Sequence, residues 1–347
     1  MTDRITGPSL PFRRKGAETR SGLVIFFHIE MADFAHSIRA RTFTRRAFLE
    51  LGGIAALVIP GLVAAGPGLA SEAFVIPRLI AAAPALASEP ARSLLTIPLE
   101  LGGVWKSSPA DAVLRVLSRM REVSLEGLRL LSDRQPDKLY VDDHPNGLPA
   151  VWLHDDHTNT AWIIVDIGPA DWSKLAYQFG HELGHVLCNS WAAASKPGPP
   201  CQWLEEAMVE AFSLRGLGRL ATSWERNPPF AGNAAFGASL REYRANLIKD
   251  YRGAGEQMSD AEIASWFRAS RSALESRAFA EGPFIVRVVG ELERDNACVE
   301  DLGALNRWPL RTGVPLEDYL TLWSKSCTEI HAQGHLPARL RSLLLVS

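Results

Sequence analysis

The spacing of apolar residues divides the chain into a short β-containing part and a longer helical part. Over residues 109–131 apolar side chains recur every three or four positions, which predicts a helix, either continuous or broken near Gly127. Three short runs rich in β-branched and aromatic residues follow, separated by turn-forming residues, at 138–142, 149–153 and 160–167. These runs predict a small β-meander.

From residue 171 onward the pattern is almost entirely helical. Asp171 is a candidate N-cap for a helix that extends to about Trp191, and a Pro- and Gly-rich loop at residues 195–200 follows it. Further helices are expected over residues 202–220, 238–251, 259–276, 278–294 and 315–330. Strands followed by helices predict an α+β fold.

The N-terminal region resembles a twin-arginine export signal. Two arginines at residues 45–46 precede an apolar run at residues 51–65. The run is short for a transmembrane helix, and cleavage is expected at residues 68–70 or, with a better motif, at residues 85–87. An uncut signal that anchors the protein in the membrane is the alternative. Met31 is an alternative start of the chain.

Composition and charge narrow the class of protein. The 347 residues are 47% hydrophobic and 22% charged, so a sizeable core is expected. A net charge of −2 and the lack of a long Lys/Arg run argue against nucleic acid as a partner. Export would take the four cysteines into an oxidising periplasmic or extracellular space, where three pairings are possible. A Cys188–Cys201 bond is favoured over a metal-binding Cys188, because a fourth protein ligand would close a zinc site to substrate.

The strongest chemical signal is the motif HELGH, which begins at His181. His181 and His185 project from one face of a helix, where two neutral imidazoles can bind one tetrahedral zinc ion. Glu182 lies beside them as a base for a zinc-bound water. The alternative is a helix whose two histidines bind no metal. His154 and His157 are also candidate ligands, although a polar hairpin turn explains them better.

A third zinc ligand is expected, because two histidines alone hold zinc poorly. The segment WLEEA at residues 203–207 resembles the W-L-x-E segment of gluzincin metallopeptidases of the aminopeptidase-N-like branch. This resemblance covers residues 160–214 and implies that Glu206 is the zinc ligand and that Glu210 supports a ligand histidine. Glu205 points elsewhere on a helix and is a distant second as ligand. The alternative places all three glutamates on a solvated helix face.

The resemblance weakens over residues 278–330, and the sequence departs from the family there. The family's oxyanion-binding tyrosine falls on Phe279, which has no donor, and its lysine falls on Glu281. The oxyanion is then stabilised by zinc itself or by a replacement donor. Candidate replacement donors are Tyr243, Tyr251, His331 and His335.

The resemblance implies a zincin-like catalytic domain over residues 88–347, after an N-terminal extension, signal and linker at residues 1–87. Within it, residues 88–170 would form a β-containing lobe and residues 171–347 a mostly helical lobe. The strand that carries Trp162 and Ile164 is expected to pair with an extended peptide substrate.

The predicted function is an exported zinc-dependent peptidase in which Glu182 activates a zinc-bound water. The family's G-A-M-E-N exopeptidase motif does not occur, so a general peptidase is expected, with a peptide or protein as substrate. Two alternatives stay open: a weak or inactive zinc-site domain that acts as a binding module in the cell envelope, and a small-molecule hydrolase. Contact with a membrane is expected only through an uncut signal.

Overall fold

The structure is a computed structural model that covers most of the chain beyond the N-terminal region. The residues that it describes are 93–103, 105, 108–129, 132–144, 148–154, 156, 159–192, 195, 198–252, 258–276 and 282–345. The export signal with its cleavage sites, Met31, His157, Phe279 and Glu281 lie outside the described residues. No helix among the described residues is long and apolar enough to cross a membrane.

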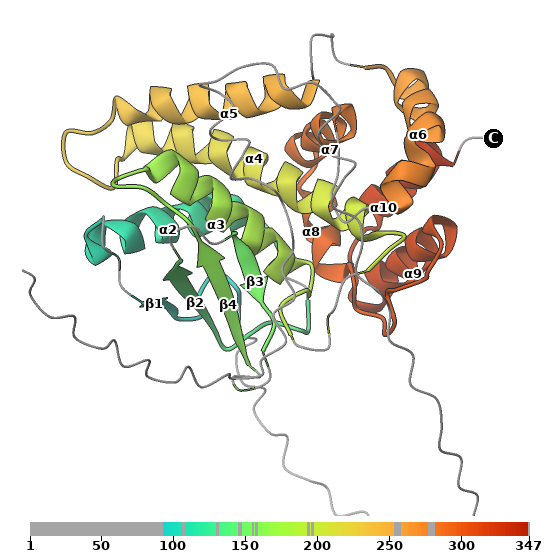
Figure 1. The fold of residues 1–347 in the computed structure, drawn as a ribbon, viewed down its shortest axis with the longest axis horizontal. Coiled ribbons are helices and arrows are strands. Elements are labelled where there is room, and N and C mark those ends of the chain that lie inside the picture. Colours follow the sequence, from blue (N-terminus) through green and yellow to red (C-terminus); the bar gives the residue numbers. More distant parts are fainter. Residues whose placement is uncertain are drawn as a thin grey trace, which may run out of the picture. The chain divides into compact units, whose positions relative to one another are not determined.

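A four-stranded mixed sheet has the strand order β1-β2-β4-β3 (Figure 1). The strands are β1 (Leu99–Gly102), β2 (Lys138–Asp143), β3 (Ala150–Trp152) and β4 (Thr160–Val165). β1 pairs with β2 and β2 with β4 in parallel, whereas β3 pairs with β4 antiparallel. The predicted meander is therefore wrong. β3 lies between β2 and β4 in sequence, yet β2 and β4 pair directly with each other in the middle of the sheet.

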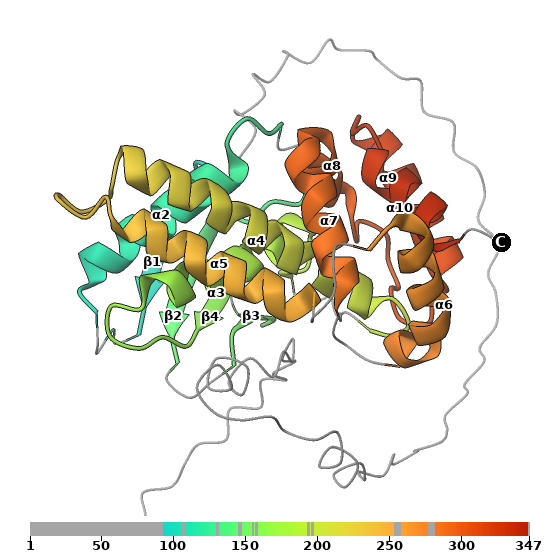
Figure 2. The ribbon, with the colours of Figure 1, turned by 90° about the horizontal axis from the view of Figure 1, so that it is seen from above.

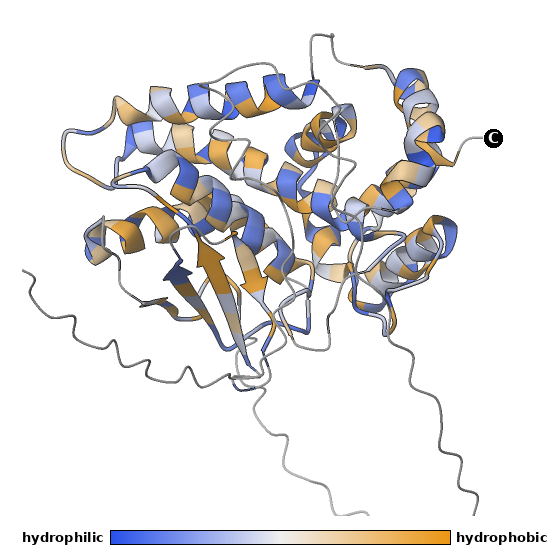
Figure 3. Cartoon of the chain, viewed as in Figure 1, coloured by the Kyte–Doolittle hydropathy of each residue, from blue (hydrophilic) through white to orange (hydrophobic). Residues whose placement is uncertain are grey.

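The burial of β4 explains its position inside the sheet. β4 ends in the three buried residues Ile163, Ile164 and Val165, and such a continuous apolar run favours an interior strand over an edge strand. β1 was not among the predicted strands, because four residues with an exposed glutamate carry little strand signal. Figure 3 shows the resulting pattern, with apolar colour along β4 and polar colour at the tip of β2, which ends in two aspartates.

The rest of the described chain is helical, which confirms the α+β class. The helices are α2 (Ala110–Leu125), α3 (Trp172–Leu187), α4 (Gln202–Arg226), α5 (Phe236–Arg252), α6 (Asp260–Glu275), α7 (Pro283–Arg294), α8 (Asn296–Glu300), the 3-10 helix η1 (Asp301–Ala304), α9 (Leu316–Glu329) and α10 (His335–Leu344). Each helix expected from the sequence is present, whereas α8, η1 and α10 were not predicted.

Helices α2 and α3 cover one face of the sheet, α4 packs on both of them, and α5 packs on α4 (Figures 1 and 2). Helix α3 thus lies between the sheet and α4, and nearly all of its residues are buried. A side-chain oxygen of Asp171 accepts a hydrogen bond from the backbone N–H of Lys174 at 3.3 Å, so the predicted N-cap is confirmed. The helix ends before Trp191, because Asn189 adopts a left-handed backbone with φ of 62°.

Helices α3 and α4 approach each other closely at Gly184. A Cβ atom at Gly184 would lie 2.9 Å from Cβ of Val209 and 3.1 Å from its Cα, which is closer than real side chains pack. Only glycine allows this approach. It places the face of α3 that carries the HELGH histidines directly against the first turns of α4.

Candidate metal centre

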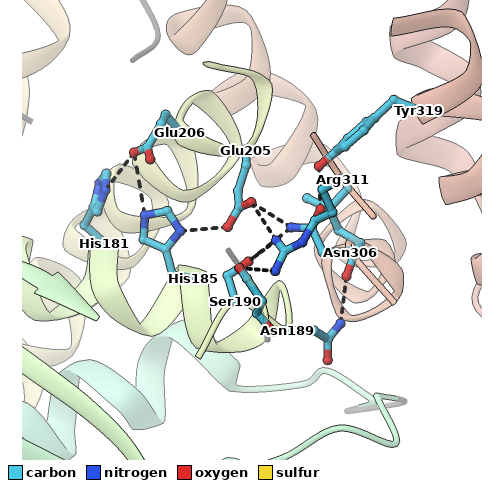
Figure 4. Close-up of polar contacts among 11 residues, drawn as sticks. His181, His185, Asn189, Ser190, Glu205, Glu206, Asn306, Arg311 and Tyr319 are labelled. Atoms are coloured by element: carbon cyan, nitrogen blue, oxygen red, sulfur yellow. Dashed lines mark hydrogen bonds and ion pairs between the residues drawn. The ribbon is translucent and has the colours of Figure 1, made fainter. Parts of the chain in front are cut away.

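Helices α3 and α4 bring three potential metal ligands together. Oε2 of Glu206 lies 3.4 Å from Nε2 of His181 and 3.6 Å from Nε2 of His185 (Figure 4). One ligand atom from each residue lies within 4.8 Å of the others. A tetrahedral ion with bonds of about 2.0–2.1 Å separates its ligand atoms by about 3.3–3.4 Å. The cluster can therefore hold a metal ion of that size.

The buried polar atoms of the cluster fit a bound ion. His181, Glu182, His185 and Glu206 are exposed by only 2%, 2%, 0% and 3%. Within the described part of the chain, Nε2 of His181, Oε2 of Glu182 and Oε2 of Glu206 make no hydrogen bond. Leaving a buried polar atom unsatisfied costs about 1–3 kcal/mol. Two of these atoms, Nε2 of His181 and Oε2 of Glu206, belong to the clustered residues and fit the donor set of a metal site, whereas Oε2 of Glu182 belongs to the proposed base beside them.

The other ring nitrogen of each histidine meets a carboxylate from α4. Nδ1 of His181 lies 2.9 Å from Oε2 of Glu210, and Nδ1 of His185 lies 2.9 Å from Oε1 of Glu205. Such partners place the proton on Nδ1 and leave Nε2 available to a metal. Glu210 thus has the geometry that the resemblance implied. Glu205 is not one of the three clustered ligands, but it contacts His185, a role that was not predicted.

A signal for Glu205 did exist in the sequence. Residues one apart on a helix point about 100° apart, so Glu205 and Glu206 can lie on either side of a histidine from a facing helix. Glu205 is only 1% exposed, and a buried carboxylate needs hydrogen-bond donors. If α4 buries its three glutamates, each carboxylate needs a hydrogen-bond partner.

The close packing of charges shifts the pKa values of the cluster. Burial raises the pKa of Glu182 to about 7. For His185, burial by itself lowers the pKa, but the carboxylates of Glu206 and Glu205 outweigh it and raise the pKa to about 9. For Glu206, burial raises the pKa, but His185 and His181 outweigh it and lower the pKa to about 2. The metal-free site therefore pairs cationic histidine with a carboxylate.

The candidate oxyanion donors lie on α5 and in the C-terminal part of the chain. Tyr251 hydrogen-bonds to Tyr177 and Glu210, which is the carboxylate behind His181. The ring of Tyr243 packs edge-on against Tyr177 with centroids 6.0 Å apart. Tyr251 therefore contacts Glu210 directly, whereas Tyr243 contacts Tyr177, whose hydroxyl donates to Oε1 of Glu210 at 2.8 Å. His335 pairs instead with Asp295 at 2.7 Å, and His331 is exposed.

The strand expected to bind substrate is in the wrong place. β4, with Trp162 and Ile164, lies between β2 and β3, so neighbouring strands pair with both of its sides. It cannot also pair with a peptide. β3 is an edge strand, and a hydrogen bond from the backbone of its residue Val151 lowers the pKa of the Glu182 carboxyl against the larger effect of burial. The ring of Trp162 packs on Trp152, with centroids 4.7 Å apart.

The expected disulfide is also absent. All four cysteines of the chain are described, and all are free and buried. The thiol of Cys201 donates to the carbonyl of Val314 at 3.3 Å, so it is directed at the loop before α9 and not at Cys188. Burial raises the pKa of Cys188 well above its usual value, and this cysteine is not among the three clustered ligands.

Comparisons with known proteins give no guide to this chain. No family model, no curated protein and no solved structure matches it. A functional assignment therefore rests on the residues and their geometry.

Proposed function

We propose that this protein is an exported zinc-dependent peptidase with a zincin-like catalytic domain. The observation that carries the proposal is the cluster of His181, His185 and Glu206, with the carboxylate of Glu182 in the same turn of α3. Two imidazoles and one carboxylate are a donor set that suits zinc and leaves a position open for water or substrate. Export is proposed from the twin-arginine motif alone.

The chemistry follows from the placement of Glu182. When bound, zinc acts as a Lewis acid and lowers the pKa of a bound water to about 7. A hydrogen bond from the backbone of Val151 holds the carboxylate of Glu182, whose Oε2 makes no hydrogen bond within the described residues and is available for a proton. Oε2 of Glu182 would accept a proton from that water while the water oxygen forms a bond to the scissile carbonyl carbon. Glu182 then returns the proton to the amine nitrogen as the C–N bond breaks.

A peptide is the proposed substrate because of β3. Its outer edge does not pair with another strand of the described sheet, and an extended peptide can add to such an edge through backbone hydrogen bonds. Since Val151 of β3 contacts Glu182, a peptide on this strand would pass close to the proposed base.

The decisive experiment is Glu182→Gln in the zinc-loaded protein. Glutamine keeps the shape and cannot accept the proton, so peptide hydrolysis should fall about 10²- to 10⁴-fold while zinc content stays at the wild-type level. Cleavage of a mixed peptide library by mass spectrometry and metal analysis measure the two quantities. His185→Ala is the control that should lose both. Unchanged turnover in Glu182→Gln would reject the mechanism.

One observation favours a second candidate, a zinc-binding domain that does not cleave peptides. The three clustered ligands and Glu182 are at most 3% exposed, which leaves little of the site open to a large substrate. Such a domain would act as a binding module in the cell envelope. Wild-type protein that binds zinc but cleaves nothing in the library would favour it. A small-molecule hydrolase would be favoured by turnover of small esters or amides that requires Glu182.

A further inference from the structure

A buried polar network extends from the metal centre into the C-terminal part of the chain (Figure 4). Oε1 of Glu205 contacts His185, and its other oxygen, Oε2, accepts a hydrogen bond from Nδ2 of Asn306 at 2.7 Å. Nη1 of Arg311 donates to the same Oε2 at 3.3 Å. Both donors lie in the segment between η1 and α9, about a hundred residues beyond Glu205 in sequence.

The two donors are themselves held on several sides. The hydroxyl of Tyr319 donates to Oδ1 of Asn306 at 2.5 Å, which turns the amide so that Nδ2 faces Glu205. Nη1 of Arg311 also donates to Oγ of Ser190 at 2.7 Å. The orientation of the amide is thus determined by the phenol on one side and the carboxylate on the other.

The network is buried and charged, which makes it expensive to form. Glu205, Asn306, Arg311 and Tyr319 are exposed by 1%, 2%, 7% and 2%. Buried ion pairs of this kind add little net stability, because desolvation of both charges offsets their attraction. Their use in fixing one geometry is better established. In this network the geometry that is fixed is that of the Glu205 carboxylate, which contacts His185.

Asn306 also has an unusual backbone conformation. It has a left-handed conformation with φ of 59°, which asparagine tolerates better than most residues. Asn189 lies next to the same loop, where its Nδ2 donates to the carbonyls of Gly303 and Leu305 at 2.9 and 2.8 Å. Asn189 therefore stabilises the loop without contacting Glu205, and it too is left-handed, with φ of 62°.

We propose that Asn306 and Arg311 are positioning residues of the metal centre. By holding Oε2 of Glu205 they direct Oε1 at Nδ1 of His185, so that Nε2 of this histidine faces the metal. The C-terminal segment thereby contributes to metal affinity without providing a ligand. This inference rests on the metal site of the proposed function and does not depend on hydrolysis.

The matched pair Asn306→Gly and Asn189→Gly tests the proposal. Glycine accepts the left-handed backbone at both positions, and each change removes hydrogen bonds at the same loop. Zinc affinity, measured by competition with a chelator, should fall about 10- to 100-fold in Asn306→Gly, as for the loss of other outer partners of a metal ligand. Asn189→Gly should lower Tm while leaving the affinity within about threefold of wild type. The absorption spectrum of the cobalt-substituted protein should change only in Asn306→Gly.

A second set of variants separates positioning from general support of the fold. Arg311→Met should lower zinc affinity, and Arg311→Lys, which keeps a donor and a charge, should recover part of it. In a Glu205→Gln background Arg311→Met should cause little further loss, because the carboxylate that it positions is gone. Equal affinity losses in Asn306→Gly and Asn189→Gly, or the same loss from Arg311→Met in both backgrounds, would overturn the inference. Wild-type protein without zinc affinity would overturn both this inference and the proposed function.

Discussion

Helix α4 buries two groups of charged side chains, and the two groups differ in how their polar atoms are satisfied. Its first turns carry Glu205, Glu206 and Glu210, and the following turns carry the buried Arg215 and the half-buried Arg219. Arg215 is only 1% exposed, as deeply buried as the glutamates. The two groups therefore allow a comparison of buried charge within one helix.

The guanidinium of Arg215 makes a hydrogen bond from every nitrogen. Nε donates to the carbonyl of Leu292 at 3.0 Å, Nη1 to that of Ser124 at 3.0 Å and Nη2 to Oδ1 of Asn296 at 2.8 Å. Ser124 and Leu292 lie in the last turns of α2 and α7, where a cation is favourable. Burial lowers the pKa of Arg215 to about 10, so it stays charged at neutral pH. This side chain joins two helix ends.

The acidic group is organised differently. Glu205 contacts His185, Asn306 and Arg311, and Glu210 contacts His181 and Tyr177. Oε2 of Glu206 instead makes no hydrogen bond within the described residues and lies 3.4 Å from Nε2 of His181. A cavity of about 610 Å³ borders Arg215 but not the metal ligands, and charges on its wall pair with each other, as Arg244 does with Glu293 at 2.6 Å.

The largest expected effect is a loss of bound zinc, and its size should differ among variants of Glu206, Glu205 and Glu210. Glu206→Ala should abolish stoichiometric zinc, because it removes a ligand. Glu205→Ala and Glu210→Ala should each lower the affinity by about 10- to 100-fold, since they remove only outer partners. Metal analysis of the three purified variants measures this order. Equal zinc content in all three would contradict the assignment of Glu206.

Arg215→Met should produce the opposite result, a loss of stability without a loss of metal. Three hydrogen bonds of about 1 kcal/mol each disappear, so the free energy of unfolding should fall by about 3 kcal/mol. Urea unfolding of the metal-free protein measures it, and the folded protein should bind zinc as wild type does. Arg226→Met is the control, because Arg226 is exposed and should change stability by less than about 0.5 kcal/mol. A specific loss of zinc affinity in Arg215→Met would remove the distinction between the two groups.

The sequence predicted the parts that depend on local pattern. Helical spacing gave α3 and α4, and the four-residue interval of His181 and His185 indicated a shared face. The resemblance then pointed to Glu206, which the structure places beside both histidines. Each of these predictions needs only the geometry of one helix and its neighbour.

The parts that the sequence did not predict depend on long-range contacts. The strand order follows from which runs are buried on both faces, and no local signal decides that β3 goes to the edge. Asn306 and Arg311 follow Glu205 by about a hundred residues, in a loop without periodicity. The cysteine prediction failed because it assumed that two cysteines near in sequence face each other.

The last expected effect is the dependence of zinc affinity on pH, and it again distinguishes the two groups. The carboxylates raise the pKa of His185 to about 9 against the effect of burial, so in the metal-free protein this histidine holds a proton at neutral pH. Zinc binds neutral imidazole and must displace that proton. The apparent affinity should therefore fall about tenfold per pH unit for each proton displaced below pH 9.

Stability of the metal-free protein should change in the opposite direction over the same range. A histidine whose folded pKa is raised stabilises the fold below its ordinary value of 6.5, and this contribution is lost as the pH rises through about 9. Tm of the metal-free protein should thus decrease from pH 6.5 to pH 9 while zinc affinity increases. Calorimetric titration in two buffers of different ionisation enthalpy counts the protons released. Glu205→Gln should shift both transitions to lower pH, whereas Arg215→Met should shift neither, because Arg215 stays charged throughout. Zinc affinity that does not vary between pH 6.5 and pH 9 would show that the histidines do not bind the metal in the way proposed.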